Sequence, residues 1–292
     1  DQRANDGAQQ HGQAPVAGAG DVAGVGLACG VLSGLALGSF ARARFAQRQV
    51  ELLGHFNERV LPCVPASARF ALITGDHDGT TPNQRDDRYP QYVGRDVWNS
   101  WLADRRIVHL FIEHLDERVP ACGRVTPIPL GLNPLEFASH NPDDALRSAA
   151  PAARGALHRR QLKALQCDRI HTRDTTFNDR RAVLALCQSS WRDVCDSQPN
   201  IPIGAFAERV AQYAFLLCVH GGGLDPNPKA WTALLAGAIP IMQRFPGDDI
   251  YRSLPVAFVD EWNATTLSEP RLRAEPKPWL LCWLRLSLAI SP

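Results

Sequence analysis

The chain has 292 residues, 45% of them hydrophobic, and its 31 basic and 30 acidic residues give a formal net charge of +1 at pH 7. This length is enough for two domains of ordinary size, each with its own core. Because the two signs of charge are interspersed, the composition argues against a broad basic surface for nucleic acid and against an acidic tail. An anionic ligand would therefore have to be bound at a local site.

The N-terminal part of the chain, residues 1–45, is rich in alanine, glycine and glutamine and has little periodic hydrophobic pattern. We expect a poorly ordered leader there. Within it, residues 22–38 are uncharged and glycine-rich. They fall just short of the ~20 apolar residues that a membrane-spanning helix needs. Two interpretations stay open for this stretch: a degraded membrane anchor, or a flexible or surface-packed leader.

The next part, residues 46–150, alternates between helical and extended patterns. Hydrophobic spacing predicts a helix over 48–61 that ends at Pro62, and a second helix over 92–106. Strands or extended segments are predicted over residues 69–74, 107–112 and 125–132. The last of these is extended because its prolines exclude a helix.

Residues 151–292 repeat this alternation. Strands are predicted over residues 162–167, 215–219, 239–242 and 256–260, and helices over 178–190, 205–214 and 228–237. Strands that alternate with helices predict parallel sheets covered on both faces. The polar stretch 138–157 separates the two halves. We therefore predict an α/β fold with two Rossmann-like lobes in tandem, residues 46–150 and 151–292.

The eight cysteines include no CxxC pair and no spacing typical of zinc sites. Metal binding by thiolates is therefore not expected. Cys167, Cys187 and Cys218 lie in apolar runs, where buried free thiols are the expected state. Disulfide bonds are compatible with the sequence, but their pairing cannot be derived from it.

The segment "CVHGGGLDPNPKAW", residues 218–231, joins a predicted strand to a predicted helix through three glycines. In α/β proteins this arrangement binds phosphate, because backbone amides and the positive end of the helix dipole point at the anion. Lys229 adds a positive charge in the first turn of that helix, which is unfavourable unless an anion is nearby. A tight turn without a ligand is the alternative. The spacing matches neither the dinucleotide GxGxxG motif nor a Walker loop.

The longer stretch "YAFLLCVHGGGLDPNPKAWTALLAGAIPIM", followed by "YRSLPVAFVDEW", resembles the donor-binding lobe of exostosin-like glycosyltransferases, especially relatives in algae and protists. Weaker similarities occur in the family's order at residues 70–82, 107–116, 125–133 and 172–183. The resemblance implies a two-lobed GT-B fold with the nucleotide-sugar held mainly by the second lobe. It also implies no obligatory metal and residence in the secretory pathway or Golgi. A membrane anchor, one of the two interpretations above, would lie upstream of or near residues 22–38.

The resemblance also implies roles for individual residues. His220 and the loop Gly221, Gly222 and Gly223 would face the diphosphate of the donor, with His220 among the catalytic residues. Asp225 would fix the loop or meet the sugar. Lys229 is nearest the position where the family usually has arginine, and Trp231 completes the predicted nucleotide-sugar site.

Several departures from the family pattern are present. One extra residue lies between Asp225 and Trp231, and Thr232 replaces the usual glutamate. After Trp262 the chain is short, apolar and interrupted by prolines, and either truncation of the second lobe or an altered reading frame would explain this ending. These departures make a catalytically inactive nucleotide- or sugar-binding pseudoenzyme an open alternative. Asp248–Asp249 lies near the donor site by this comparison, but exposed acids of a turn are expected.

Asp76-His77-Asp78 follows the predicted strand 69–74 and forms a DxD pattern. Carboxylates at this spacing suit Mg²⁺ or Mn²⁺, so a metal-dependent glycosyltransferase using Asp76 and Asp78 is an alternative. An Asp-rich turn is the more common structure for such a triplet. Under the family interpretation this loop meets the acceptor, and Asp76 or His77 is the general base. Glu113 and Asp116 are weaker acceptor-site candidates.

His77, His109 and His114 could be combined into a zinc site. The five-residue spacing of the last two fits neither face of a helix or strand cleanly, so surface or hydrogen-bonded histidines are expected. Trp98 and Trp101, three residues apart on a predicted helix, could stack on a sugar. Core packing is the expected role for both.

The resemblance therefore implies a metal-independent glycosyltransferase without a cofactor. It would move a sugar from a nucleoside-diphosphate sugar to the hydroxyl of a glycan or glycoprotein acceptor, and nucleic acid is not an expected partner.

Overall fold

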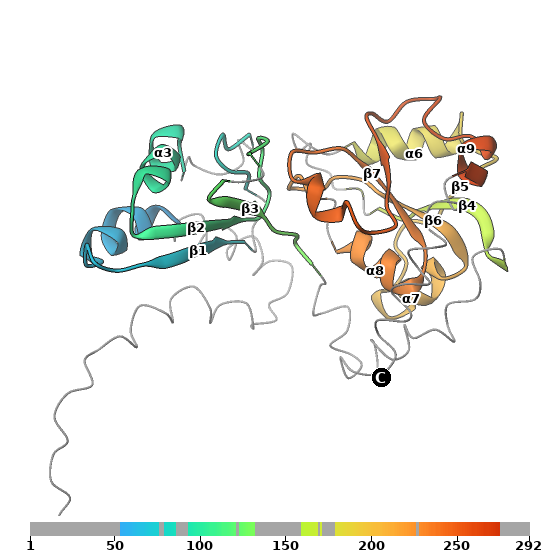
Figure 1. Cartoon of the computed structure of the whole chain (residues 1–292). Helices are drawn as coiled ribbons and strands as arrows, with labels where there is room; N and C mark the ends of the chain where they lie inside the picture. The colour runs from blue at the N-terminus through green and yellow to red at the C-terminus, as the bar shows by residue number, and fades with distance from the viewer. Residues whose placement is uncertain are drawn as a thin grey trace, which may run out of the picture. The chain divides into compact units, whose positions relative to one another are not determined.

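A computed structural model of the chain describes residues 53–75, 79–85, 93–120, 123–131, 159–168, 170, 179–225 and 228–274. The chain separates into two units, residues 1–35 and residues 36–292. The described residues of the second unit form two parallel β-sheets, one of three strands and one of five. Figure 1 shows both sheets. The predicted α/β class with parallel sheets is therefore confirmed. The predicted leader and the predicted boundary at 138–157 lie outside the described residues.

The first sheet is built from the strands β1 (Phe70–Thr74), β2 (Ile107–Ile112) and β3 (Val125–Pro127), in that spatial order and all parallel. The helical turns η2 (Phe56–Val60) and η3 (Leu61–Cys63) precede β1, and the helix α3 (Arg95–Ala103) connects β1 to β2. The first predicted helix continues past Pro62 because this residue sits in the first positions of the 3-10 turn η3, where its missing N–H breaks no helical bond.

The core of the first sheet lies between its strands and α3. Trp98 and Trp101 of α3 are both fully buried there, together with aliphatic side chains of β1 and β2. The Trp101 indole N–H donates a hydrogen bond to Asn57 Oδ1 at 3.2 Å. The prediction that both tryptophans serve core packing is confirmed. On the strands, Ile73 and Val108 remain 58% and 48% exposed.

The second sheet contains β4 (Gln161–Gln166), β5 (Cys195–Ser197), β6 (Tyr213–Cys218), β7 (Ile239–Gln243) and β8 (Ala257–Val259). Its spatial order is β5-β4-β6-β7-β8, with every pair parallel. Counted from its own first strand, the order is 2-1-3-4-5, that of a common doubly wound fold. The chain thus winds first to one side of β4 and then to the other.

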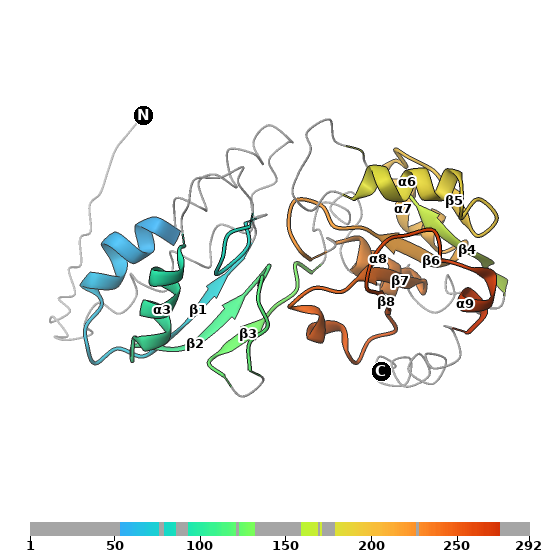
Figure 2. The ribbon, with the colours of Figure 1, turned by 90° about the horizontal axis from the view of Figure 1, so that it is seen from above.

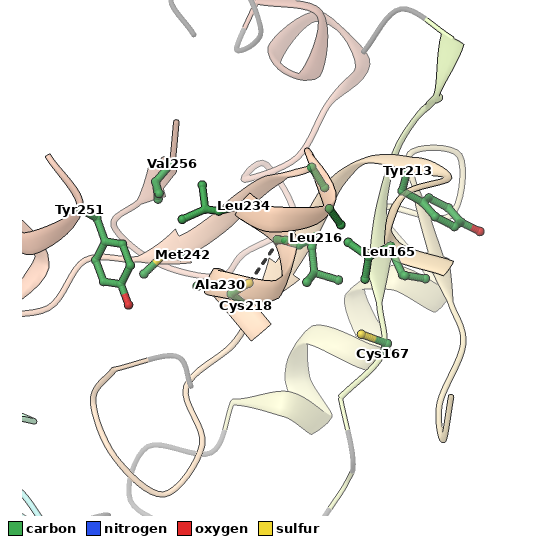
Figure 3. Packing of buried hydrophobic residues seen from close by; sticks show 14 of the residues in the cluster. Leu165, Cys167, Tyr213, Leu216, Cys218, Ala230, Leu234, Met242, Tyr251 and Val256 are labelled. Carbon is green, nitrogen blue, oxygen red and sulfur yellow. Dashed lines mark hydrogen bonds between the residues drawn. The ribbon is translucent and has the colours of Figure 1, made fainter. Parts of the chain in front are cut away.

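Helices cover both faces of this sheet, as Figures 1 and 2 show. The helices α6 (Arg180–Gln188) and α9 (Glu269–Ala274) contribute to one buried cluster, and α7 (Ile203–Val210) and α8 (Lys229–Ala236) to the other. The central strand β6 is buried along its whole length. In the cluster that contains α7 and α8, side chains of α8 pack against side chains of the strands β4, β6 and β7 (Figure 3). A continuous apolar run at β6 is what a parallel strand buried on both faces requires.

The end of α8 follows the sequence prediction closely. Gly237 adopts a left-handed conformation, with φ of 78°, directly after the last helical residue. This conformation strains residues that carry a Cβ atom, which is why glycine commonly terminates helices.

Two elements differ from the sequence predictions. The helix predicted over 205–214 ends at Val210 as α7, and Tyr213 and Ala214 instead begin β6. Both side chains are buried in the sheet layer, so tertiary burial outweighs the helical spacing. The edge strand β5 was not predicted, because its three residues are too few to carry a periodic pattern.

The cysteines also differ in part from expectation. Cys187 of α6 is bonded to Cys195 of β5, so the prediction of a free thiol at Cys187 is wrong. The bond attaches the short edge strand to the helix that precedes it. Cys167 and Cys218 are buried and outside disulfide bonds, as predicted. Within the part of the chain that the structure describes, no helix has the length and apolarity needed to span a membrane.

Candidate anion-binding site at the glycine loop

The glycine loop lies at the topological switch point of the second sheet. β4 is followed by α6 and the outer strand β5, whereas β6 is followed by α8 and by β7 on the opposite side. Loops at the carboxyl ends of two such strands diverge and leave a crevice, which is where open α/β sheets bind ligands. The residues that follow β4 and β6 here are 167–168 and 219–225.

His220 is placed at this edge by β6, which ends two residues earlier. The side chain is only 6% exposed, and its Nε2 has no hydrogen-bond partner among the described residues. The ring stands edge-to-face on Phe245, with centroids 6.1 Å apart. Burial lowers the pKa of His220 to about 4, although a backbone hydrogen bond at Gln243 acts in the opposite direction. The imidazole is therefore neutral at pH 7, with one nitrogen unsatisfied.

Gly223 is held against a histidine of the first sheet. A Cβ atom added to Gly223 would lie 2.3 to 2.6 Å from three ring atoms of His114. Real Cβ atoms do not approach so closely, so glycine is required at this position. The reason is the approach of His114 rather than of a ligand. Gly221 and Gly222 lie on the more open side of the loop, where both are half-buried.

Asp225 holds the loop through hydrogen bonds to three separate segments. Its Oδ1 accepts from the Tyr251 hydroxyl at 2.9 Å, and its Oδ2 accepts from the Leu130 amide at 2.9 Å. Its own backbone N–H donates to His114 Nδ1 at 3.1 Å. Burial and the Asp225 carboxylate raise the pKa of Tyr251, so the hydroxyl stays a donor. Asp225 therefore anchors the glycine loop to the end of β2 and to the segment after β3.

Lys229 begins α8 and forms an ion pair with Asp168, which follows β4. The Asp168 side chain is fully buried, and Arg180 of α6 places its Nε 3.4 Å from the same Oδ1 atom. Gln166 donates an amide hydrogen bond to Oδ2 at 3.3 Å. The anion that the sequence required beside Lys229 is thus supplied, at least in part, by Asp168.

The sequence motifs do not single out Asp168 and Arg180. A signal for them exists, however. Asp168 directly follows the predicted strand 162–167, and Arg180 lies in the first turn of the next predicted helix. Because the carboxyl ends of parallel strands share one edge, both residues could have been assigned to the edge of the glycine loop.

The remaining residues of the predicted donor site lie in α8. Trp231 is half-buried and packs on the Tyr251 ring, with centroids 5.7 Å apart. Thr232 is buried, and its hydroxyl donates to the Pro228 carbonyl oxygen at 3.2 Å. Threonine has no carboxylate to offer a ligand at this position, and its hydroxyl is hydrogen-bonded within its own helix.

The site residues predicted for the N-terminal half of the chain are only partly described. Asp76, His77 and Asp78 lie outside the described residues. Asp116 is fully buried and accepts hydrogen bonds from the Thr80 hydroxyl at 2.7 Å and from the Asn83 side-chain amide at 2.9 Å. This carboxylate therefore fixes the loop 79–83.

Among the residues that the structure describes, no group of three or more histidine, cysteine or acidic side chains is close enough to hold a metal ion. His109 Nε2 is 2.8 Å from the Thr126 hydroxyl on the sheet surface. His114 is buried against the glycine loop instead. The two histidines are therefore engaged separately, as expected from their spacing.

The burial of Asp248 differs from the sequence prediction. Asp248 was expected as an exposed turn residue, but it is buried, with one oxygen 3.2 Å from Arg118 and the other 3.2 Å from Arg244. Its turn folds into the 3-10 helix η5 (Asp248–Tyr251), which brings the carboxylate inward between the two guanidinium groups. Asp249 is exposed, as expected.

Fold and site together define a class: an α/β protein with parallel sheets and an anchored glycine loop at the switch point of the larger sheet. Comparison with models of known protein families gives no match, and a search of curated proteins gives none either.

Proposed function

We propose that the chain is an exostosin-like glycosyltransferase of the GT-B type, which moves a sugar from a nucleoside-diphosphate sugar to a glycan hydroxyl without a metal. The two-lobed GT-B arrangement and the donor-binding role of the second sheet are parts of this proposal. So are a glycan or glycoprotein acceptor and residence in the Golgi.

One observation carries the proposal: a glycine loop and a helix start lie at the switch point of a doubly wound sheet, and the loop contains a buried histidine nitrogen without a hydrogen-bond partner among the described residues. Ligands of such sheets bind at this edge, and phosphate groups favour helix N-termini. The unsatisfied Nε2 of His220 is costly to bury, and a ligand hydrogen bond would remove that cost.

The chemistry proposed for the site is electrostatic. Lys229, the first turn of α8 and the amides of Gly221 and Gly222 would stabilise the negative charge that develops on the departing diphosphate. Arg180 lies beside the same carboxylate as Lys229 and adds a second cation to this edge. A neutral His220 would donate or accept one hydrogen bond without adding charge.

The residues proposed to act on the acceptor follow β1 in the sequence. Asp76 or His77 would take the proton of the acceptor hydroxyl. A metal-dependent enzyme that holds Mn²⁺ or Mg²⁺ between Asp76 and Asp78 is the alternative for this loop.

Two further observations bear on the proposal. The disulfide bond Cys187–Cys195 supports a secretory-pathway location, because disulfides persist in oxidising compartments. Thr232, whose hydroxyl is used by its own helix, favours the second candidate function, a pseudoenzyme that binds the nucleotide-sugar without transfer.

A thermal-shift screen with uridine- and guanosine-diphosphate sugars tests donor binding. At a hundredfold excess over Kd, a ligand of the folded state raises its stability by about 2.7 kcal/mol, or roughly 5 to 10 °C in Tm. Lys229→Met should abolish this shift. Lys163→Met is the matched control, because Lys163 also pairs with an aspartate, Asp196, but within β4 and β5. Equal shifts in wild type and Lys229→Met would contradict the proposed site.

Activity separates the alternatives once a donor is found. Release of the nucleoside diphosphate in the presence of a glycan acceptor is expected for the transferase and not for the pseudoenzyme. EDTA should leave the metal-independent enzyme active, whereas it should stop an enzyme that depends on Asp76 and Asp78.

A further inference from the structure

We infer that His114, in the turn after β2, is a positioning residue that fixes the glycine loop after β6 in its donor-binding conformation. This inference rests on the proposed function as far as the donor is concerned. The contact itself stands on the geometry of the described residues.

The backbone of His114 has an uncommon conformation. Its φ is 51°, in the left-handed region that few residues other than glycine adopt. Its carbonyl oxygen accepts a hydrogen bond from the Thr81 amide at 3.2 Å, directly after β2 ends. Such conformations cost energy and persist where the surroundings hold them, often near functional sites. Here the conformation aims the imidazole at the loop after β6.

The imidazole fills the space beside Gly223 and accepts a hydrogen bond from the backbone amide of Asp225. Ring atoms lie where a Cβ of residue 223 would be, and Nδ1 accepts the Asp225 N–H at 3.1 Å. The side chain is buried, so water does not compete for this hydrogen bond. An Nδ1 that accepts a hydrogen bond carries no proton, so the ring at this contact is the neutral tautomer with its proton on Nε2.

The contact made by His114 also affects α8, the helix proposed to bind the donor. Asp225 is also bonded to Tyr251, whose ring packs on Trp231 in the first turns of α8. Loss of the His114 contact would therefore release the loop while both sheets stay folded. A loop that occupies its binding conformation only a tenth of the time weakens the apparent affinity about tenfold.

Two substitutions separate the hydrogen bond from the backbone conformation. Glycine and asparagine both tolerate a positive φ, so neither strains the backbone at this position. Asparagine places Oδ1 where histidine has Nδ1, and it can accept the Asp225 N–H. His114→Gly offers no acceptor. His114→Asn should therefore behave like wild type, and His114→Gly should not.

Hydrogen exchange of the Asp225 amide gives a measurement that needs no ligand. In the full chain we expect protection in wild type and His114→Asn, and at least tenfold faster exchange in His114→Gly. Tm values give a second measurement: Gly223→Ala should lower Tm strongly in wild type and much less in His114→Gly, where the ring is absent. Protection in His114→Gly equal to wild type, or lost equally in both variants, would overturn the inference.

Donor binding completes the test with the uridine- and guanosine-diphosphate sugars as probes. We expect the Kd of His114→Gly to rise about tenfold or more and that of His114→Asn to stay near wild type. An unchanged Kd in His114→Gly would overturn the positioning role. If wild type binds none of these sugars while the exchange pattern holds, the proposed function fails and the anchoring of the loop by His114 stands.

Discussion

Replacing His220 by glutamine should make folding stability less dependent on pH between pH 7 and pH 4. The folded protein keeps this imidazole neutral down to a pKa of about 4, because the ring is buried. In the unfolded chain the pKa returns to roughly 6.5. Between pH 6.5 and pH 4 the unfolded state binds a proton at this histidine and the folded state does not. The free energy of unfolding therefore decreases as the pH falls. The loss amounts to about 2 kcal/mol at pH 5 and about 3 kcal/mol at pH 4.

Urea unfolding followed by tryptophan fluorescence measures this effect. The free energy of unfolding is determined at pH 7, 6, 5 and 4 for wild type and His220→Gln. Other titrating groups act in both proteins and cancel in the difference between the two curves. We expect the stability of wild type to fall more steeply below pH 6.5, with the difference approaching about 3 kcal/mol at pH 4. Parallel curves would refute the conclusion that His220 is buried in its neutral form.

Other predictions concern stability away from His220. Replacing both Cys187 and Cys195 by serine opens a loop with a sequence separation of 8 and should cost about 2 to 3 kcal/mol, and a reducing agent should then no longer lower Tm. Asp168→Asn removes the carboxylate beside Lys229 and should cost about 3 to 5 kcal/mol in urea unfolding, of which the double variant with Lys229→Met should recover a part. Trp101→Ala, at a fully buried position, should cost about 3 to 5 kcal/mol by the same assay.

Most of the fold could be predicted from hydrophobic spacing, because parallel strands buried on both faces leave continuous apolar runs. The run at β6 and the left-handed Gly237 after α8 show this directly. The failures have identifiable causes. β5 is too short for a pattern, and Tyr213 belongs to a strand because burial between helices outweighs local propensity.

The candidate site could be predicted in position but not in its internal contacts. Strand, glycine turn and helix locate the loop after β6, and Lys229 signals a nearby anion. That Asp168 supplies a carboxylate depends on the order of strands, which places the end of β4 next to β6. Gly223 makes room for His114, which lies 109 residues earlier in the chain, and no local sequence pattern predicts such a distant contact.

The two buried histidines near the loop make different contacts, and these contacts connect the experiments. His114 has its Nδ1 occupied by the Asp225 amide, so it holds the loop. His220 has a buried Nε2 without a hydrogen-bond partner among the described residues, and the proposed function assigns a ligand contact to it. The Phe245 ring packs on both His220 and Tyr251, which donates its hydroxyl hydrogen bond to Asp225. Release of the loop would therefore loosen the packing around His220 and admit water. In His114→Gly the pKa of His220 should then rise toward its ordinary value, and the steep loss of stability below pH 6.5 should become shallower.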